Sequence, residues 1–260
     1  CRCAMPFRAA LIDIDGVLTV GGRALARSAE ALAALHARGI GLRFVTNATQ
    51  HTRDELVRWL QAQGFEIDTR EVLTGALAAR ELLVARGLRP HLLVHPGLRP
   101  EFDGLRTDDP NAVLVGDAGE GFSFEALNAA FRVLIAQPGR PLIALGANRC
   151  YRAADGLCLD AGPFVAALEY AAQVKAECTG KPAAPIFRAA LDALGASAAD
   201  AVMVGDDVEG DIGGAAALGL RTVLVRTGKY RAGDEARGPH RPGRVADDLH
   251  DAVQRLLGAD

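Results

Sequence analysis

The chain contains 260 residues, half of them hydrophobic, and its formal net charge is −3 at pH 7. This size allows one large globular domain or two smaller ones, and the chain lacks the basic excess that a dedicated nucleic-acid-binding protein normally shows. No apolar run reaches the about 20 residues that span a bilayer, so we expect no membrane segment. We also expect no signal peptide, and residues 1–4 receive no function because Met5 has the character of an initiator.

Short apolar segments alternate with amphipathic segments, a pattern typical of α/β proteins with a mostly parallel sheet. The segments that predict strands are 9–14, 41–46, 112–115, 142–145, 201–205 and 221–225. The segments that predict helices are 28–38, 53–62, 124–135, 164–173, 186–194, 210–218 and 247–257. Polar or glycine-rich stretches predict surface loops at 99–109, 148–162 and 229–244. Because the strands are continuously apolar, we expect helices on both faces of the sheet.

Two aspartates follow the first predicted strand, in the segment Asp13-Ile14-Asp15-Gly16. Ligands of open α/β sheets bind at the carboxyl ends of strands, and a two-residue spacing in an extended chain places both side chains on one face. One carboxylate can attack phosphorus, the other can act as general acid and base, and carboxylates suit Mg²⁺. Asp and Gly also favour a plain turn, so this segment alone leaves both interpretations open.

The next predicted strand ends in Thr46 and Asn47, which can bind phosphate oxygens together with the N-terminus of the following helix. The alternative is that Asn47 or Thr49 caps that helix. Lys181 is one of three lysines in a chain rich in arginine, and a fixed ammonium there can neutralise phosphate charge. The alternative is an exposed lysine that only adds solubility.

Three more acids, Asp206, Asp207 and Asp211, follow the strand predicted at 201–205. Such acids can complete a Mg²⁺ site directly or support its ligands. Acids that complement the dipole of the next helix are the alternative for Asp211, but this explains Asp206 less well, because it directly follows the apolar strand.

The segment Val115-Gly116-Asp117 repeats this strand–glycine–aspartate form, so periodicity alone does not separate Asp117 from Asp206; the acidic neighbours favour Asp206. His91 and His95 flank an apolar pair, which indicates packing rather than metal binding. The cysteines show no zinc-type spacing, which favours free thiols in a reducing cytoplasm.

Taken together and in this order, the segments 13–17, 45–47, 180–182 and 205–211 resemble the four motifs of the haloacid dehalogenase (HAD) superfamily. The long insertion between Asn47 and Lys181 resembles a C2-type cap domain. Three further segments are similar to the branch that contains phospholysine phosphohistidine inorganic pyrophosphate phosphatase and its HAD-like hydrolase domain-containing relative; they are 109–113, 162–170 and 227–231.

The resemblance implies a Rossmann-like core with a parallel sheet, formed by residues 1–78 and 177–260, and an inserted α/β cap formed by residues 79–176. It implies that Asp13 is the nucleophile and Asp15 the general acid and base. Dehalogenases of the superfamily lack this second acid, so Asp15 favours a phosphatase. One relative has Ser at the position that matches Asp15, which puts equal catalytic behaviour across the branch in doubt.

The resemblance also implies the ligands of the substrate and of the metal. The residues implied to bind the phosphoryl group are Thr46, Asn47 and Lys181. The residues implied to bind Mg²⁺ are Asp13, Asp206 and, through its backbone carbonyl, Asp15, with Asp211 supporting the site.

Three functions are compatible with these residues. The first is a Mg²⁺-dependent phosphatase that acts on a small substrate through an aspartyl-phosphate, with phosphoamides or pyrophosphate suggested by the resemblance. The second is a phosphomonoesterase for phosphoglycolate-type or nucleotide-type substrates. The third is a non-catalytic binding protein, because a fold does not by itself grant activity. The presence of Asp13, Asp15, Lys181 and Asp206 argues against it.

The partners expected are a small phosphorylated molecule and, in one possible assembly, a second copy of the chain, with no nucleic acid and no membrane. We expect a cytoplasmic location. In the predicted cap, Arg149, Arg152 and Asp155 of the loop 148–162 can read the charge of the substrate. The alternative is that these three are ordinary solvated loop residues.

Overall fold

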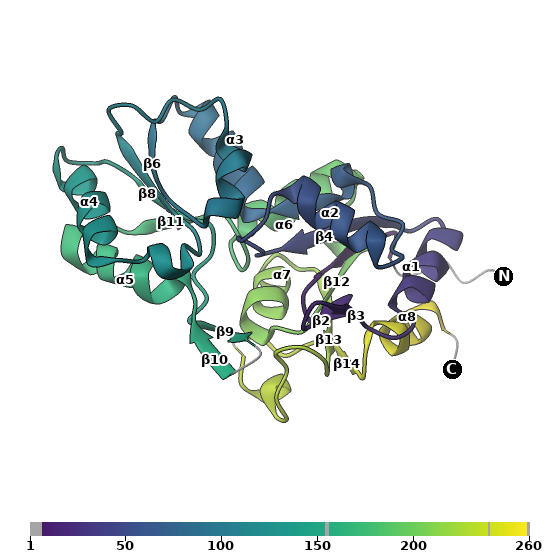
Figure 1. Ribbon diagram of the computed structural model, residues 1–260. Coiled ribbons are helices and arrows are strands. Elements are labelled where there is room, and N and C mark those ends of the chain that lie inside the picture. The colour runs from purple at the N-terminus through teal and green to yellow at the C-terminus, as the bar shows by residue number, and fades with distance from the viewer. Residues whose placement is uncertain (1–6, 154–155, 239, 259–260) are drawn as a thin grey trace. The chain divides into compact units, whose positions relative to one another are not determined.

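The computed structural model describes residues 7–153, 156–238 and 240–258, and its packing divides the chain into two compact units (Figure 1). The core unit comprises Cys1–Thr46, Val57–Leu73 and Lys181–Asp260, and the inserted unit comprises Asn47–Leu56 and Thr74–Gly180. The predicted division at residues 78 and 176 stays a prediction. Residues 1–4 and Asp155 lie outside the described residues.

A six-stranded sheet forms the centre of the core unit, in the order β14-β13-β12-β1-β4-β5. Its strands are β1 (Ala9–Ile12), β4 (Gly41–Thr46), β5 (Val72–Thr74), β12 (Ala201–Gly205), β13 (Arg221–Val225) and β14 (Arg244–Ala246). The pairs from β14 to β4 are parallel. A short antiparallel hairpin, β2 (Thr19–Val20) and β3 (Arg23–Ala24), follows β1.

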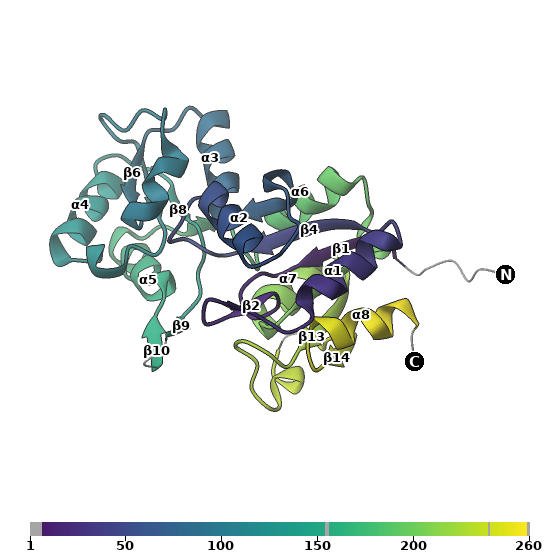
Figure 2. The same ribbon diagram turned by 45° about the vertical axis from the view of Figure 1, so that its right-hand side comes forward.

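Helices cover both faces of this sheet. They are α1 (Ser28–Ala37), α2 (Arg53–Ala62), α6 (Ala184–Leu194), α7 (Gly214–Ala217) and α8 (Leu249–Leu257), and a π-helix, η5 (Val208–Gly213), precedes α7. Leu11, Met203 and Phe187 belong to one buried cluster, in which α6 packs on β1 and β12. The helices α1 and α8 lie side by side in both views (Figure 2). Every residue of β1 is buried, so both of its faces are covered, as the continuous apolar pattern predicted.

The inserted unit has a four-stranded parallel sheet in the order β11-β8-β7-β6. Its strands are β6 (Pro90–Leu93), β7 (Ala112–Val115), β8 (Leu142–Ala144) and β11 (Ala176–Cys178). Its helices include α3 (Gly75–Ala85), α4 (Phe124–Ile135) and α5 (Ala161–Ala172). Side chains alternate along β7: Val113 and Val115 pack with α4 and α5, whereas Leu114 packs with α3 on the opposite face.

Four predicted segments need correction. The first strand ends at Ile12 rather than at residue 14, because the chain turns after Asp13. The loop 99–109 begins inside a 3₁₀ helix, η2 (Pro96–Phe102), which buries Leu98 and Phe102. The loop 148–162 contains an antiparallel hairpin, β9 (Cys150–Ala153) and β10 (Gly156–Leu159), together with the first residues of α5. The helix predicted at 210–218 consists of η5 and the short α7.

The short strands β5, β6, β11 and β14 and the helix α3 were not predicted. None of the helices in the described part of the chain has the length and apolar character that a membrane crossing requires.

Candidate active site

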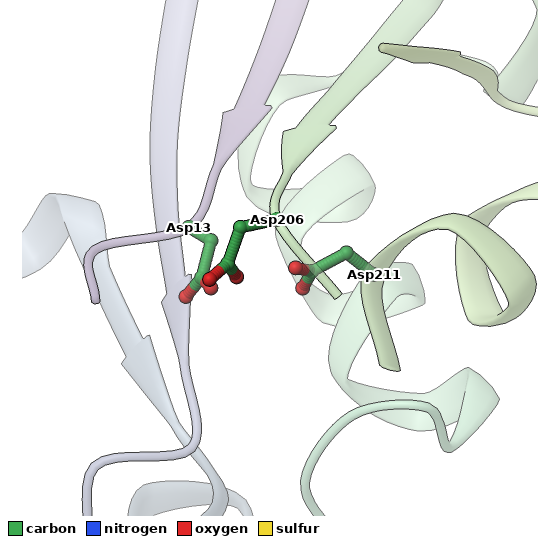
Figure 3. A group of neighbouring side chains, drawn as sticks. All are labelled: Asp13, Asp206 and Asp211. Atoms are coloured by element: carbon green, nitrogen blue, oxygen red, sulfur yellow. The ribbon is translucent and has the colours of Figure 1, made fainter. Parts of the chain in front are cut away.

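Three carboxylates meet at the carboxyl edge of the core sheet (Figure 3). Asp13 directly follows β1 and Asp206 directly follows β12, and these strands are parallel neighbours in which Ile12 pairs with Val204. Asp211 lies in η5, which begins two residues after Asp206. One oxygen of each carboxylate lies within 4.8 Å of the others. The strand order therefore brings together acids that stand far apart in the sequence.

Lys181 joins this cluster from the start of the last core segment. Its Nζ lies 2.6 Å from Oδ1 of Asp13 and 2.7 Å from Oδ1 of Asp211, and its side chain is only 4% exposed. The alternative of an exposed, solubilising lysine is therefore wrong. The backbone N–H of Ile14 also donates to Oδ1 of Asp13, at 2.8 Å. One oxygen of Asp13 is thus held by two donors.

Negative charge exceeds positive charge in this buried group. Burial raises the pKa of Asp206 well above its usual value, and the charges of Asp13 and Asp211 raise it further. Burial and then Asp13 raise the pKa of Asp211 to about 7. Burial alone would lower the pKa of Lys181, but Asp13 and Asp211 outweigh it and raise that pKa above its usual value. A bound cation would relieve this excess of negative charge.

The carboxylate of Asp206 fits such a cation. Its Oδ2 accepts the backbone N–H of Lys229 at 2.6 Å. Its Oδ1 is buried and accepts no hydrogen bond from the part of the chain that the structure describes. A buried, unpaired carboxylate oxygen beside two further carboxylates offers the oxygen donors that hard divalent cations prefer. Asp13, Asp206 and Asp211 can therefore hold a metal ion.

Three glycines make room for these carboxylates, and one of them is Gly228, where a Cβ would overlap the carboxylate of Asp206. Gly16 has a φ of +96°, and a Cβ at this position would overlap the carboxylate of Asp206. Gly205 ends β12, and a Cβ there would overlap the carboxylate of Asp211. A side chain at any of these positions would displace an acid of the cluster.

Comparison with known proteins agrees with this geometry. Residues 10–106 match the family described as haloacid dehalogenase-like hydrolase, and residues 178–252 match the family described as HAD-hydrolase-like. The chain is 48% identical over 254 residues to phospholysine phosphohistidine inorganic pyrophosphate phosphatase of Rattus norvegicus, covering 96% of this chain and 94% of that protein. The chain belongs to the haloacid dehalogenase-like hydrolase family.

Other members of the HAD family are also similar to this chain over nearly its whole length. Haloacid dehalogenase-like hydrolase domain-containing protein 2 of Bos taurus is 42% identical over 250 residues, which cover 96% of each chain. Among solved structures, p-nitrophenyl phosphatase from Archaeoglobus fulgidus has a TM-score of 0.88 at 28% identity, covering 96% of this chain and 99% of that chain. The predicted superfamily, the α/β fold class and the enzyme class, a HAD phosphatase, are confirmed.

The second acid of the HAD motif does not share the environment of the first. Asp13 is 5% exposed, whereas Asp15 is exposed, and the Asp15 carboxylate accepts the hydroxyl of Thr19 at 3.4 Å. Both aspartates lie beyond the end of β1 at Ile12, so the strand does not extend through them as expected; that their side chains share one face stays a prediction. Asp15 is exposed to solvent, and its role as general acid and base stays a prediction.

The two polar residues at the end of β4, Thr46 and Asn47, fall in different units. Thr46 ends the strand next to β1 and is 1% exposed. Asn47 begins the inserted unit, and a Cβ on Gly180 would come within 2.6 Å of its Oδ1. The alternative that Asn47 or Thr49 caps α2 is wrong, because the helix begins at Arg53.

The residue before Arg53 provides this cap. Oγ1 of Thr52 accepts the N–H of Glu55 at 3.3 Å, and the Glu55 carboxylate accepts the N–H of Thr52 at 3.0 Å. The phosphate-binding roles of Thr46, Asn47 and Lys181 stay predictions.

Sequence reasoning placed Lys229 in a solvated loop and missed its contacts with the acids. Besides its backbone bond to Asp206, its Nζ pairs with Oδ2 of Asp207 at 3.3 Å. Burial would lower the pKa of Lys229, but Asp207, then Asp13 and the other acids, raise it. Two sequence signals could have singled it out: the rarity of lysine in this chain, and its place in the segment 227–231 that resembles the phosphatase branch.

Asp117 and His95, the weaker candidates from the sequence, behave as packing residues. Both oxygens of Asp117 accept hydrogen bonds, one from Nε2 of Gln50 at 2.8 Å and one from the N–H of Gly119 at 2.9 Å. Nδ1 of His95 accepts the N–H of Gly97 at 3.1 Å. Of the cap residues, Arg149 precedes β9 and Arg152 belongs to it. Their role in substrate choice stays a prediction.

Proposed function

We propose that this HAD phosphatase depends on Mg²⁺ and hydrolyses a small phosphorylated substrate through an aspartyl-phosphate on Asp13. The observation that carries the proposal is the buried cluster in which Lys181 holds Asp13 and Asp211, beside the unpaired Oδ1 of Asp206. Phosphoamides and pyrophosphate are the first candidate substrates, because a relative at 48% identity is a phosphatase named for phospholysine, phosphohistidine and inorganic pyrophosphate.

The chemistry begins at Asp13. Its Oδ1 is fixed by Lys181 and by the N–H of Ile14, so Oδ2 is the oxygen proposed to attack phosphorus in line. The bond from Oδ2 to phosphorus forms while the bond to the leaving group breaks, and Asp15 donates a proton to the leaving atom. Asp15 then takes a proton from the water that hydrolyses the aspartyl-phosphate, which returns both acids to their starting states.

Charge neutralisation is the second contribution to catalysis, because phosphoryl transfer depends mostly on positioning and electrostatics. Mg²⁺, held by Asp13, Asp206 and the backbone carbonyl of Asp15, would neutralise the phosphoryl oxygens. Asp211 also pairs with Lys181, at 2.7 Å, and so helps to hold the ammonium that contacts Asp13.

A phosphomonoesterase is the second candidate function, favoured by the likeness to the p-nitrophenyl phosphatase. A cytoplasmic location and a homodimer remain predictions. The described cysteines, Cys150, Cys158 and Cys178, are free, in keeping with a reducing compartment. A sizing measurement tests the dimer.

The deciding experiment compares turnover of phospholysine, phosphohistidine, pyrophosphate and p-nitrophenyl phosphate with Mg²⁺ and with chelator. We expect phosphoamides or pyrophosphate to give the highest kcat/KM, and chelator to stop turnover. Asp13→Asn should lower kcat by at least about 10³-fold without lowering Tm, as loss of a covalent nucleophile does. Acid quenching should trap phosphate on the wild-type chain and none on the variant.

Asp54→Asn, an acid of the inserted unit, is the matched control and should leave turnover unchanged. Turnover that survives in Asp13→Asn would remove the nucleophile assignment. A flat response of the wild type to all four substrates would instead favour a non-catalytic binding protein.

A further inference from the structure

The loop after β13 brings a second ammonium to the carboxyl edge of the core sheet. Because β13 is the parallel neighbour of β12, this loop lies beside Asp206. The hydroxyl of Thr227 donates to the carbonyl of Gly16, and the N–H of Lys229 donates to Oδ2 of Asp206. These two bonds fix the backbone at residues 227–229, and therefore the point from which the side chain of Lys229 starts.

The two lysines at this edge differ in what remains available to a ligand. Lys181 is 4% exposed and its ammonium is shared between two carboxylates at 2.6 and 2.7 Å. The side chain of Lys229 is 38% exposed, and the ion pair recorded for its ammonium is longer, 3.3 Å to Asp207. An ammonium has three donors, so Lys229 can bind an incoming anion while it keeps this pair.

Asp207 is itself suited to hold this lysine in place. Its Oδ1 accepts the backbone N–H groups of Glu209 and Gly210, each at 2.9 Å, and its Oδ2 faces Lys229. Asp207 is therefore fixed to the first turn of η5 and limits the region that the Lys229 ammonium can reach.

We propose that Lys229 is a specificity-determining residue that binds the second phosphoryl group of a diphosphate substrate. The proposal rests on the proposed function, in which the phosphoryl group to be transferred lies at Asp13. The leaving group of pyrophosphate is a second phosphate, whose anionic oxygens need a partner outside the Asp13–Lys181 pair. Lys229 supplies it at the same sheet edge, with its backbone already bonded to Asp206.

In this reaction Lys229 moves no proton. The bond from Asp13 to the first phosphorus forms, the bridging P–O bond breaks, and its electron pair leaves with the second phosphate. Asp15 protonates that phosphate, and Lys229 stabilises its negative charge through a charge-assisted hydrogen bond. A substrate with one phosphoryl group and an uncharged leaving group gains nothing from this contact.

The test measures binding and turnover in Lys229→Met, which removes the charge and keeps the backbone N–H that binds Asp206. Calorimetry in Mg²⁺ with methylenediphosphonate and methylphosphonate should show tighter binding of the diphosphonate to the wild type. Lys229→Met should weaken diphosphonate binding by about tenfold, as expected for one partly exposed charged contact, and change methylphosphonate binding by less than about threefold.

Turnover should follow the same division. In Lys229→Met, kcat/KM should fall by about tenfold for pyrophosphate, mainly through KM, and by less than about threefold for p-nitrophenyl phosphate. Lys229→Arg should recover most of the loss. Lys175→Met is the matched control, because this lysine is 89% exposed and pairs with Glu169 in the inserted unit.

Equal losses for both substrates would mean that Lys229 acts only by positioning Asp207, and no loss would mean that it has no role; either result overturns the proposal. Failure of the proposed function is a separate result. Suppose that the wild type turns over neither substrate but prefers the diphosphonate to methylphosphonate, and that Lys229→Met loses this preference. This result would refute the phosphatase activity and retain the Lys229 binding site.

Discussion

The two units end a buried parallel strand with the same two residues and use them differently. In the core unit, β12 runs into Gly205-Asp206; in the inserted unit, β7 runs into Gly116-Asp117. Both strands are fully buried, and the two aspartates are 1% and 7% exposed. The two aspartates therefore occupy similar positions in the sequence of their strands and are buried to a similar extent.

The neighbours of the two carboxylates differ. Asp117 receives neutral donors on both oxygens, from Gln50 and Gly119, and its charge is satisfied within the inserted unit. Asp206 lies beside Asp13 and Asp211, and its Oδ1 has no donor among the described residues. A strand followed by glycine and aspartate thus positions a carboxylate. The residues at the ends of the adjacent strands determine whether that carboxylate accepts hydrogen bonds within a turn or can bind a cation.

The largest expected difference is in activity. Asp206→Asn should lower kcat/KM by at least about 10²-fold, since it removes a charged ligand of the proposed metal site. Asp117→Asn should stay within about threefold of the wild type and lower Tm by a few degrees at most. Phosphatase assays and thermal melts on both variants measure this contrast, and comparable activity losses would erase the distinction.

A smaller difference is expected at the preceding glycines. Gly205→Ala places a Cβ against the carboxylate of Asp211 and should weaken the apparent affinity for Mg²⁺ by about tenfold. Gly116→Ala places a Cβ 2.8 Å from Cδ1 of Leu145, a side chain that can shift, and should cost about 1–3 kcal/mol of stability.

Magnesium titrations of activity, paired with urea unfolding, measure the two glycine variants. The same Mg²⁺ requirement in Gly205→Ala as in the wild type would show that the position of Asp211 is immaterial to the metal.

The smallest expected effect is a pH dependence confined to the core cluster. In chelator, burial and Asp13 raise the pKa of Asp211 to about 7 from 3.8 in the unfolded chain. The folded state then binds the extra proton, so this group's contribution to the free energy of unfolding is present below about pH 4 and is lost as pH rises through about 7.

Urea unfolding at pH 5 and pH 8 tests this sign. The stability of Asp211→Asn relative to the wild type should increase between these pH values by on the order of 1 kcal/mol. Mg²⁺ should reduce the increase, since a cation favours the ionised acid. A difference that does not change with pH would contradict the raised pKa.

Site residues whose position follows from the local sequence could be predicted from the sequence alone. Asp13 and Asp206 each follow a continuously apolar strand, and the parallel sheet then dictates that they lie at one edge. The exposure of Asp15 was not predictable in this way, because the spacing argument assumed that the strand continues past Ile12. The hydrogen bonding of Asp206 could not be predicted either, because it depends on residues that are near it in space and far from it in sequence.

The contacts of Lys229 could not be predicted either. They depend on β13 lying next to β12, and a sequence of strands does not state their order in the sheet. The burial of Lys181 has a similar cause, since it follows from two acids that stand 168 and 30 positions away in the chain. Long-range pairing of this kind has no signal in hydrophobic periodicity.

The position of β1 between β12 and β4 has a consequence for synthesis of the protein. On the ribosome, Ala9 must wait for its register partner Ala201, so one edge of β1 stays open while the intervening residues are made. The four strands of the inserted sheet lie between Pro90 and Cys178 and are complete earlier. The nascent chain therefore carries a wholly apolar strand with one unpaired edge through most of its translation, and such an edge is a natural substrate for chaperones.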